Sequence, residues 1–376
     1  MNPISSGTNA NLTRRDFIKA AGLGGAGLAV LPGATLQGAE AGGKKLVMAL
    51  VGGAHIHTPN YVNILKGRAD VSVKYVWDHD LARAAKWAKV LGARVVDDDG
   101  HIWNDREVVG VVICSETDRH HGLVLAAAQA GKHMFVEKPL GVNSQESYAM
   151  AAAIEKAGVL FTTGYFMRTQ PHILFLKQQV EQANFGKITR VQGSNCHNGS
   201  LGGWFDTDWR WMADPKIAGV GAFGDLGTHS LDILMWLCGG IASVAADIKI
   251  VTGRYPGCDE SGEALMKFKN GVTGTLAAGW VDLAEPVPLL ISGTEGHAVV
   301  FQDQLYYRSN KVLGADGKAP WTQLPAALPP PMEMFVNAVA GQPGMALVSP
   351  AEAAARVSVM EAMYHAAHDH RWAKPA

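Results

Sequence analysis

The segment GKHMFVEKPL, residues 131–140, decides the fold that the sequence predicts. Its apolar centre has the composition of a strand, and it ends in a carboxylate, an ammonium group and a proline. A proline cannot donate a ladder hydrogen bond, so we expect the strand to end here, with Lys138 at its carboxyl end. Open α/β sheets bind their ligands at the carboxyl ends of the strands. The sequence therefore predicts that Lys138 lies in a ligand site.

A second polar segment, GDLGTHSLD at residues 224–232, leads directly into the apolar run ILMWL. If this segment is helical, Asp225, His229 and Asp232 share one face and the large apolar side chains share another. A lysine, a carboxylate and a histidine can then converge on one ligand. We interpret the two segments as halves of a single site.

Length and composition favour two domains. A chain of 376 residues exceeds the usual size of a single core, and 48% hydrophobic with 18% charged residues is enough to fill two cores. The formal net charge of −1 gives neither the basic footprint of a nucleic-acid-binding protein nor an acidic tail. These features favour a small, uncharged partner over nucleic acid.

The amino terminus has the features of an export signal over residues 1–41. Arg14 and Arg15 precede a short, glycine-rich apolar run at residues 20–31, which is followed by Ala39-Glu40-Ala41 as a small-x-small cleavage site. This order is typical of a twin-arginine signal, whose export machinery carries folded proteins to the periplasm. The run is too short to span a bilayer, so we expect no membrane span. The alternative is an untargeted amphipathic amino terminus.

Strands and helices alternate over the first half of the chain. Apolar runs at residues 44–51, 71–77, 108–114 and 159–165 are separated by helical patterns, including residues 61–67, 123–130 and 144–157. This alternation predicts an α/β domain with a doubly wound parallel sheet of the Rossmann type. Thr58 is predicted to cap the first helix and Pro59 to be its first residue.

The loop after the first strand stands where a dinucleotide fingerprint is expected. Of the three glycines in that pattern only Gly52 is present, with Ala54 and His57 at the other two positions. Ala54 still permits close approach to a pyrophosphate, which the helix behind it would favour. For His57 two interpretations stay open: a phosphate or nicotinamide contact, and a hydrogen bond at the start of the helix.

The tip of the second strand carries Asp78. A carboxylate at this position can bind a ribose diol and repels a 2′-phosphate, so NAD is favoured over NADP. Asp80 competes for the same role. The alternative for Asp78 is the N-cap of the following helix.

The second half of the chain predicts an α+β domain with an open-faced, mostly antiparallel sheet. A helix at residues 171–183 precedes strands at residues 187–197, 242–252, 264–269, 272–280 and 289–301, and helices at residues 332–339 and 351–367 close the chain. Asn270-Gly271 predicts a hairpin with a type I′ turn. The loop GGWFDTDWRW at residues 202–211 contains Trp209 and Arg210, which either bind a sugar or attach the loop to the sheet.

The motif Glu137-Lys138-Pro139, followed by a glycine-rich turn with Asp225 and His229 four residues later, resembles the Gfo/Idh/MocA oxidoreductases. The resemblance implies a Rossmann domain at residues 44–165, a domain for substrate binding and oligomerisation at residues 166–345, and a carboxyl-terminal helix at residues 346–376. It implies nicotinamide-dependent chemistry on a pyranose or cyclic polyol, and a homo-oligomer.

Oxidation of a hydroxyl group requires a base, a cation for the developing alkoxide and a hydride acceptor. His229 suits the first role, Lys138 the second, and Asp225 would orient the substrate or the imidazole. With the resemblance, the expected cofactor contacts are Gly52, Ala54, His55, His57, Asp78, Ser115, His120, Glu137 and Lys138. The expected substrate contacts are Tyr165, Arg168, Trp209, Arg210, Asp225 and His229. No metal site is expected, because Asp225 and His229 are too few ligands and the four cysteines lack metal-binding spacing.

Three functions remain open at this point. The first is an oxidoreductase that oxidises one sugar and returns the hydride to a second acceptor on a cofactor that stays tightly bound, since an exported enzyme cannot draw on the cellular nicotinamide pool. The second is an NAD-dependent, redox-neutral glycosidase that acts by transient oxidation at C3 and elimination. The third is a non-catalytic sugar- or cofactor-binding protein. The lysine of Glu137-Lys138-Pro139 favours the first.

Overall fold

The computed structural model describes residues 45–376, and Lys45–Ala376 form one compact unit. The predicted export signal at residues 1–41 lies outside the described residues and stays a prediction. Among the described residues, no helix has both the length and the apolar character needed to cross a membrane.

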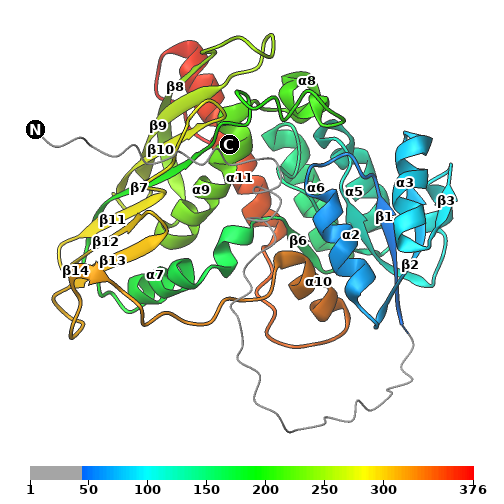
Figure 1. Cartoon of the computed structure of the whole chain (residues 1–376), viewed down its shortest axis with the longest axis horizontal. Coiled ribbons are helices and arrows are strands. Elements are labelled where there is room, and N and C mark those ends of the chain that lie inside the picture. The colour runs from blue at the N-terminus through cyan, green and yellow to red at the C-terminus, as the bar shows by residue number, and fades with distance from the viewer. Residues whose placement is uncertain (1–44) are drawn as a thin grey trace, which may run out of the picture. The chain divides into compact units, whose positions relative to one another are not determined.

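The first sheet has six parallel strands in the order β3-β2-β1-β4-β5-β6 (Figure 1). The strands are β1 (Leu46–Val51), β2 (Val71–Trp77), β3 (Arg94–Val96), β4 (Val108–Ile113), β5 (His133–Val136) and β6 (Phe161–Thr163). This order reverses direction between β1 and β4, so the crevice for a ligand opens at the carboxyl ends of these two strands. The predicted doubly wound sheet is confirmed.

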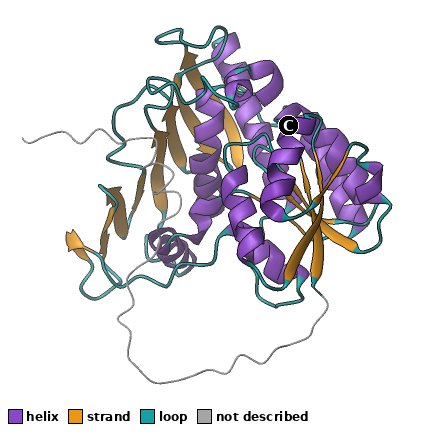
Figure 2. Cartoon of the chain, turned by 45° about the vertical axis from the view of Figure 1, so that its right-hand side comes forward, coloured by secondary structure: helices purple, strands orange, loops and turns teal. Residues whose placement is uncertain are grey.

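Helices cover both faces of this sheet (Figure 2). On one face lie α2 (Thr58–Gly67), α3 (Leu81–Leu91) and α10 (Pro331–Val339), and on the other lie α5 (His120–Gln129), α6 (Ser144–Ala157) and the start of α11 (Pro350–Asp369). A short helix, α4 (Gly100–Trp103), and the 3-10 turn η1 (Thr117–Arg119) complete this half. The central strands are apolar throughout because both faces are buried.

One helix start differs from the prediction. Thr58 is the first residue of α2 and His57 is the residue before it, so Thr58 is not the cap and Pro59 is the second helical residue. The side chain of His57 makes no capping hydrogen bond, because its ring turns instead toward Glu137. The local helix-start interpretation of His57 is therefore wrong.

The second sheet has eight strands in the order β14-β13-β12-β11-β7-β10-β9-β8 (Figure 1). They are β7 (Ile188–Cys196), β8 (Ile241–Lys249), β9 (Ser261–Phe268), β10 (Thr273–Gly279), β11 (Leu289–Gly293), β12 (Gly296–Phe301), β13 (Gln304–Ser309) and β14 (Asp316–Pro320). Neighbouring strands are antiparallel except for β7 and β10, which run parallel. The predicted mostly antiparallel sheet is confirmed.

Three details of this sheet differ from the prediction. The single strand expected at residues 289–301 is a hairpin of β11 and β12, and β13 and β14 were not predicted. Asn270-Gly271 does join two antiparallel strands, but only Gly271 has a positive φ (90°). A type I′ turn needs positive φ at both central residues, so the predicted turn type is wrong.

The remaining elements connect the two sheets. They are η2 (Phe166–Thr169), α7 (Pro171–Glu181), η3 (Arg210–Ala213), α8 (Pro215–Ala218) and α9 (Ala222–Cys238). Helix α9 is buried along nearly its whole length and packs on β7 and β10, while α11 contacts α6 of the first half and α9 and β8 of the second (Figure 1). Helix α9 is thereby fixed between the two sheets, with its amino end at the crevice.

Candidate active site

Lys138 and Asp225 form an ion pair between the two halves of the described unit. The Nζ atom of Lys138, just past the end of β5, donates to a carboxylate oxygen of Asp225 at 2.7 Å and to its backbone carbonyl at 3.3 Å. The indole of Trp280 donates to the other carboxylate oxygen at 3.3 Å. Burial alone would raise the pKa of Asp225, but the ammonium of Lys138 outweighs it and lowers this pKa to about 2. Asp225 is therefore ionised at neutral pH.

His229 lies one helical turn after Asp225 and is only 4% exposed. Its ring packs against Phe166 and Tyr165, with centroid distances of 5.1 Å and 6.1 Å. Burial, and after it the charge of Lys138, lower the pKa of His229 well below its usual value. Within the described part of the chain, the Nδ1 atom of His229 is buried and has no hydrogen-bond partner. A neutral imidazole with an unused nitrogen is suited to accept a proton.

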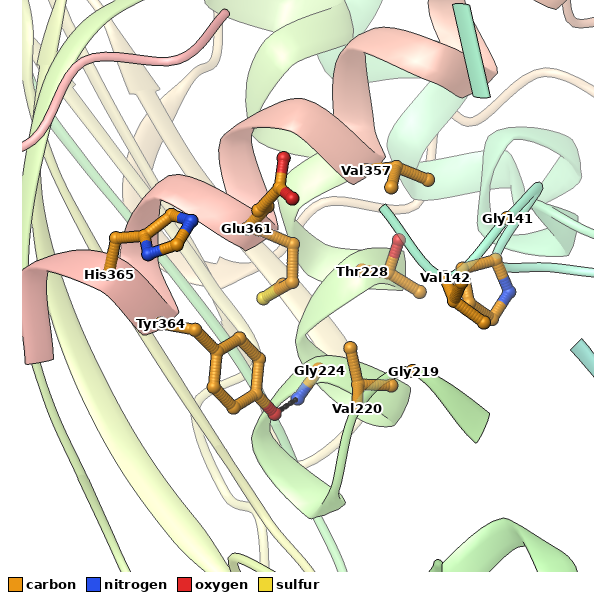
Figure 3. Close-up of a pocket in the computed structure, with 12 residues that line it drawn as sticks. Gly141, Val142, Gly219, Val220, Gly224, Thr228, Val357, Glu361, Tyr364 and His365 are labelled. Carbon is orange, nitrogen blue, oxygen red and sulfur yellow. Dashed lines mark hydrogen bonds between the residues drawn. The ribbon is translucent and has the colours of Figure 1, made fainter. Parts of the chain in front are cut away.

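The amino end of α9 is held by Tyr364 of α11. Its hydroxyl accepts hydrogen bonds from the backbone N–H groups of Gly221 and Gly224, both at 3.1 Å, and donates to Asp259 at 2.9 Å. Figure 3 shows the bond to Gly224. Because two of the unpaired helix-start N–H groups bond to one buried hydroxyl, the first turn of α9 is fixed. A cavity of about 210 Å³ lies beside this anchor, and Thr228 and Glu361 are among the other residues that line it (Figure 3).

The middle of α9 is held by buried charges. Arg168 donates to both carboxylate oxygens of Asp232 at 2.8 and 2.6 Å, and Arg356 donates to one of them at 2.9 Å. Arg168 also bonds to Glu352 at 2.9 Å. This network joins η2, α9 and α11 one turn beyond His229. The guanidinium of Arg168 is thus committed to protein groups, which does not favour its predicted role in substrate binding.

The crevice above β1 and β4 has the close backbone approach that a dinucleotide requires. Gly52 has a φ of 76°, and a Cβ atom there would lie 2.6 Å from Ser115, so no other residue fits without displacement. The next amide, of Gly53, donates to Asp78 at 2.8 Å and links the tips of β1 and β2. Ala54 directs its amide to Cys114 at the end of β4. These features fit a dinucleotide that crosses the strand tips.

Asp78 is buried and fully hydrogen-bonded. In addition to Gly53, it accepts from the amide of Asp80 and from Arg83, which donates to both oxygens at 2.6 and 2.7 Å. Arg83 also contacts Glu116 at 2.8 Å. Asp80, not Asp78, caps α3, so the N-cap interpretation of Asp78 is wrong. A ribose diol has to displace Arg83 from Asp78 in order to bind there.

A cluster of two histidines and one carboxylate lies beside the ion pair. The Nδ1 atoms of His57 and His55 lie 2.9 Å and 3.6 Å from the same oxygen of Glu137. The Tyr61 hydroxyl donates to that oxygen at 2.5 Å, and the Lys138 amide donates to the other at 2.8 Å. Burial lowers the pKa of His55 to about 3. Burial alone would raise the pKa of Glu137, but the neighbouring histidines and Lys138 hold it well below its usual value.

The other predicted cofactor contacts lie at the same edge of the sheet. Ser115 follows β4, and its hydroxyl donates to the carbonyl of Glu116 at 3.2 Å. The ring of His120 is buried, with Nδ1 3.2 Å and 3.1 Å from the carbonyl oxygens of Pro139 and Leu140. His120 therefore ties the tip of β4 to the loop that follows Lys138.

The segment before α9 covers this edge. Trp211 donates from its indole to the carbonyl of Ala54 at 3.2 Å, and its ring centroid lies 6.0 Å from that of His55. Trp211 and Met212 line a small cavity of about 10 Å³ with Lys138, Asp225 and other residues. Such a cavity has room for about one water molecule. A sugar can reach Lys138 from this side only if the segment moves.

The remaining predicted substrate contacts are less central. Tyr165 is 2% exposed and its hydroxyl lies 2.9 Å from that of Thr228. Its ring is therefore held in place where it packs edge-on against His229. Arg210 is exposed, with its guanidinium 4.6 Å from the ring centroid of Tyr255, and Trp209 is half-buried in the same loop. Their roles in substrate binding stay predictions.

Among the residues of the site that were not predicted from the sequence are Tyr61, Trp211 and Arg356. Tyr61 lies one helical turn after His57, a spacing that could have pointed to their shared partner Glu137. Trp211 directly follows Trp209 and Arg210, which were predicted as substrate contacts. Arg356 carries no sequence signal, because an arginine within a helix is usually exposed.

The chain matches two family models. Residues 46–165 match the oxidoreductase family with an NAD-binding Rossmann fold, and residues 173–299 match the GFO/IDH/MocA C-terminal domain. Together they cover the two sheets described above.

Curated relatives agree with this assignment. Levoglucosan dehydrogenase of Pseudarthrobacter phenanthrenivorans is 29% identical over 45% of this chain and 43% of its own length. The scyllo-inositol 2-dehydrogenase (NAD(+)) of Bacillus subtilis is 26% identical over 70% of this chain and 75% of its own. The chain thus spans less than half of the first relative and three quarters of the second.

A solved structure shares the fold. The complex of levoglucosan dehydrogenase with NADH and levoglucosan has a TM-score of 0.73 with 22% identity, over 88% of this chain and all (100%) of that one. At this identity the similarity speaks for the fold alone. With both family models matched in order, the chain belongs to the Gfo/Idh/MocA oxidoreductase family, with an NAD-binding Rossmann domain at its amino-terminal side.

Proposed function

We propose that this protein is an NAD-dependent dehydrogenase that oxidises a secondary hydroxyl group of a pyranose, a glycoside or a cyclic polyol. The observation that carries the proposal is the buried pair of Lys138 and Asp225, with neutral His229 one turn away, at the end of the dinucleotide crevice. The relatives named above are dehydrogenases of an anhydrosugar and of an inositol, which supports this substrate class.

Each residue of the group has a part in the proposed reaction. NAD, when bound, accepts the hydride from the carbon that carries the hydroxyl. His229 accepts the hydroxyl proton, because its imidazole is unprotonated and its Nδ1 atom has no hydrogen-bond partner in the described part of the chain. The ammonium of Lys138 stabilises the negative charge that develops on the oxygen. Asp225 holds Lys138 in place, and its low pKa keeps that ion pair intact over the working range of pH.

The cofactor and its location belong to the same proposal. Seven of the predicted cofactor contacts lie at or beside the strand tips where NAD would bind: Gly52, Ala54, His57, Asp78, Ser115, His120 and Glu137. The paired arginines at positions 14 and 15 support export through the twin-arginine machinery to the periplasm, with NAD taken up beforehand and retained. The open-faced second sheet supports a homo-oligomer.

The test is to measure reduced-nicotinamide fluorescence on the protein as purified, with no cofactor added, before and after mixing with a panel of pyranoses, inositols and glycosides. A single-turnover rise, stoichiometric with protein, is expected for the substrate. Absence of any rise, both here and with added NAD, would overturn the dehydrogenase proposal. Release of a free aglycone without net reduction would instead identify a glycosidase. A rise that occurs only with added NAD would support the dehydrogenase reaction, but it would show that the purified protein does not retain the cofactor.

A further inference from the structure

The carboxylate of Glu137 is fully buried, yet no lysine or arginine lies within ion-pair distance of it in the described part of the chain. Its side chain is 0% exposed, and the only basic groups within 4.0 Å of it there are His55 and His57. Lys138 is next in sequence, but its ammonium pairs with Asp225. A buried carboxylate without a permanently charged partner at ion-pair distance is costly, and the close contacts of this one are with two imidazoles, a tyrosine hydroxyl and a backbone amide.

The two imidazoles are arranged as metal ligands would be. Their Nδ1 atoms lie 2.9 Å and 3.6 Å from one oxygen of Glu137, and one ligand atom from each residue lies within 4.8 Å of the others. In a tetrahedral zinc site with bonds of about 2.0–2.2 Å, ligand atoms are separated by about 3.3–3.5 Å. The observed distances lie on either side of this value.

The groups around the cluster would serve as the outer shell of such a site. Tyr61 donates to the oxygen shared with the histidines, and the Lys138 amide holds the second oxygen, so the carboxylate is already oriented. Among the described residues, the side chain of His55 has one competing hydrogen bond, at 3.2 Å from the His57 amide. His57 is 28% exposed, which gives an ion a path from solvent.

We propose that His55, His57 and Glu137 form a binding site for a divalent transition-metal ion, with Zn²⁺ as the best match. Two imidazoles and one carboxylate are a donor set of open zinc sites, in which the fourth position holds water or a ligand oxygen. On binding, the metal takes the place of the proton between Nδ1 of His57 and Glu137, and the neutral imidazole carries its proton on Nε2 instead. Under this proposal His57 stands where a dinucleotide loop has its third glycine because it binds the metal, with His55 as the second imidazole ligand.

Direct metal binding tests the proposal without reference to turnover. The tag-free protein is treated with a chelator, dialysed against micromolar Zn²⁺, and analysed for metal content, while Co²⁺ is titrated to follow its visible absorption. We expect one ion per chain and a spectrum typical of four-coordinate cobalt. Failure to retain a stoichiometric ion, or a six-coordinate spectrum only, would overturn the proposal.

Three variants locate the ion. His57→Ala is expected to weaken Zn²⁺ affinity at least 100-fold, and Tyr61→Phe, which removes an outer-shell bond, about 10-fold. His79→Ala is the matched control, because His79 also contacts a carboxylate, Glu116, but lies outside the cluster. Affinity unchanged in His57→Ala, or lost equally in His79→Ala, would contradict the assignment. Circular dichroism of each variant confirms folding. Loss of NAD turnover with zinc binding intact would count against the proposed function and not against this site.

Discussion

The Nζ atom of Lys138 lies 2.7 Å from a carboxylate oxygen of Asp225, although 87 positions separate the two residues in the chain. Lys138 follows strand β5 of the first sheet, and Asp225 lies in the first turn of α9, which packs on the second sheet. The proposed chemistry therefore depends on the packing between the two halves as much as on either motif.

Lys138→Ala should remove the cation that stabilises the developing alkoxide. We expect kcat to fall about 10²- to 10³-fold, with little change in NAD affinity. The substitution also leaves Asp225 buried without its partner, so the double variant Lys138→Ala/Asp225→Asn should recover stability without recovering activity. Steady-state kinetics and thermal melts measure the two effects. Recovery of activity in the double variant would contradict the role of Lys138.

The pH profile should reflect the neutral state of His229. Its pKa in the folded protein lies well below 6.5, so the base is unprotonated at pH 6.5 and kcat/KM should be constant from pH 8 to 6.5. Activity should fall only as the pH drops through the lower pKa of the folded protein. His229→Gln should lose about 10²- to 10⁴-fold in kcat/KM. An acidic limb at or above pH 6.5 that disappears in His229→Gln would show that the imidazole is charged in the resting protein.

Arg83 should moderate the preference for NAD over NADP. Because it neutralises Asp78 and occupies both of its oxygens, Arg83→Ala should free the carboxylate for the ribose and restore its repulsion of a 2′-phosphate. We expect the ratio of NAD to NADP affinity to rise about tenfold, equivalent to ~1.4 kcal/mol. Asp78→Ala should lower this ratio.

Fluorescence titration of both cofactors measures this ratio. Arg119→Ala is the matched control, since Arg119 also approaches Glu116, at 3.7 Å, without touching Asp78. If Arg83→Ala weakens NAD binding, the guanidinium itself contributes to the cofactor site.

Asp232→Asn should destabilise the fold more than it alters the chemistry. It removes the buried carboxylate that Arg168 and Arg356 share and leaves them, in the described part of the chain, only Glu352, so we expect a loss below the ~3–5 kcal/mol of a fully unpaired buried charge. Denaturant unfolding measures the loss. The substrate KM in the folded fraction should stay nearly constant. An increase in KM with stability unchanged would support the predicted contact between Arg168 and substrate.

The sequence predicted the site where the local chemistry left few choices. Pro139 ends a strand, which places Lys138 at the edge of a parallel sheet, and the polar spacing before an apolar run predicts α9. It did not predict that Arg83 covers Asp78, because the choice among rotamers of a long side chain depends on tertiary contacts. The sequence also predicted one strand in place of β11 and β12. The reason is that the turn between Gly293 and Gly296 is short and the apolar pattern continues on both sides of it.

The packing of α10 could not be predicted either. Met332, Phe335 and Val336 of this helix lie in the core of the first sheet, more than 160 residues beyond the predicted end of that domain at residue 165. Periodicity shows which face of a helix is apolar, but not which sheet that face covers. The predicted boundaries between the domains, at residues 165 and 345, stay predictions.

Trp211 should control the exchange of NAD. Its indole donates to the carbonyl of Ala54 and its ring centroid lies 6.0 Å from that of His55, so we expect this contact to slow the opening of the cofactor crevice. Trp211→Ala should speed both association and dissociation of NAD at least tenfold, as measured by stopped-flow fluorescence of the reduced cofactor. Trp211→Phe keeps most of the ring and loses one hydrogen bond worth about 1 kcal/mol, so its rates should rise only about fivefold. Unchanged rates in Trp211→Ala would mean that NAD enters by another route, and that retention of the cofactor has a different cause.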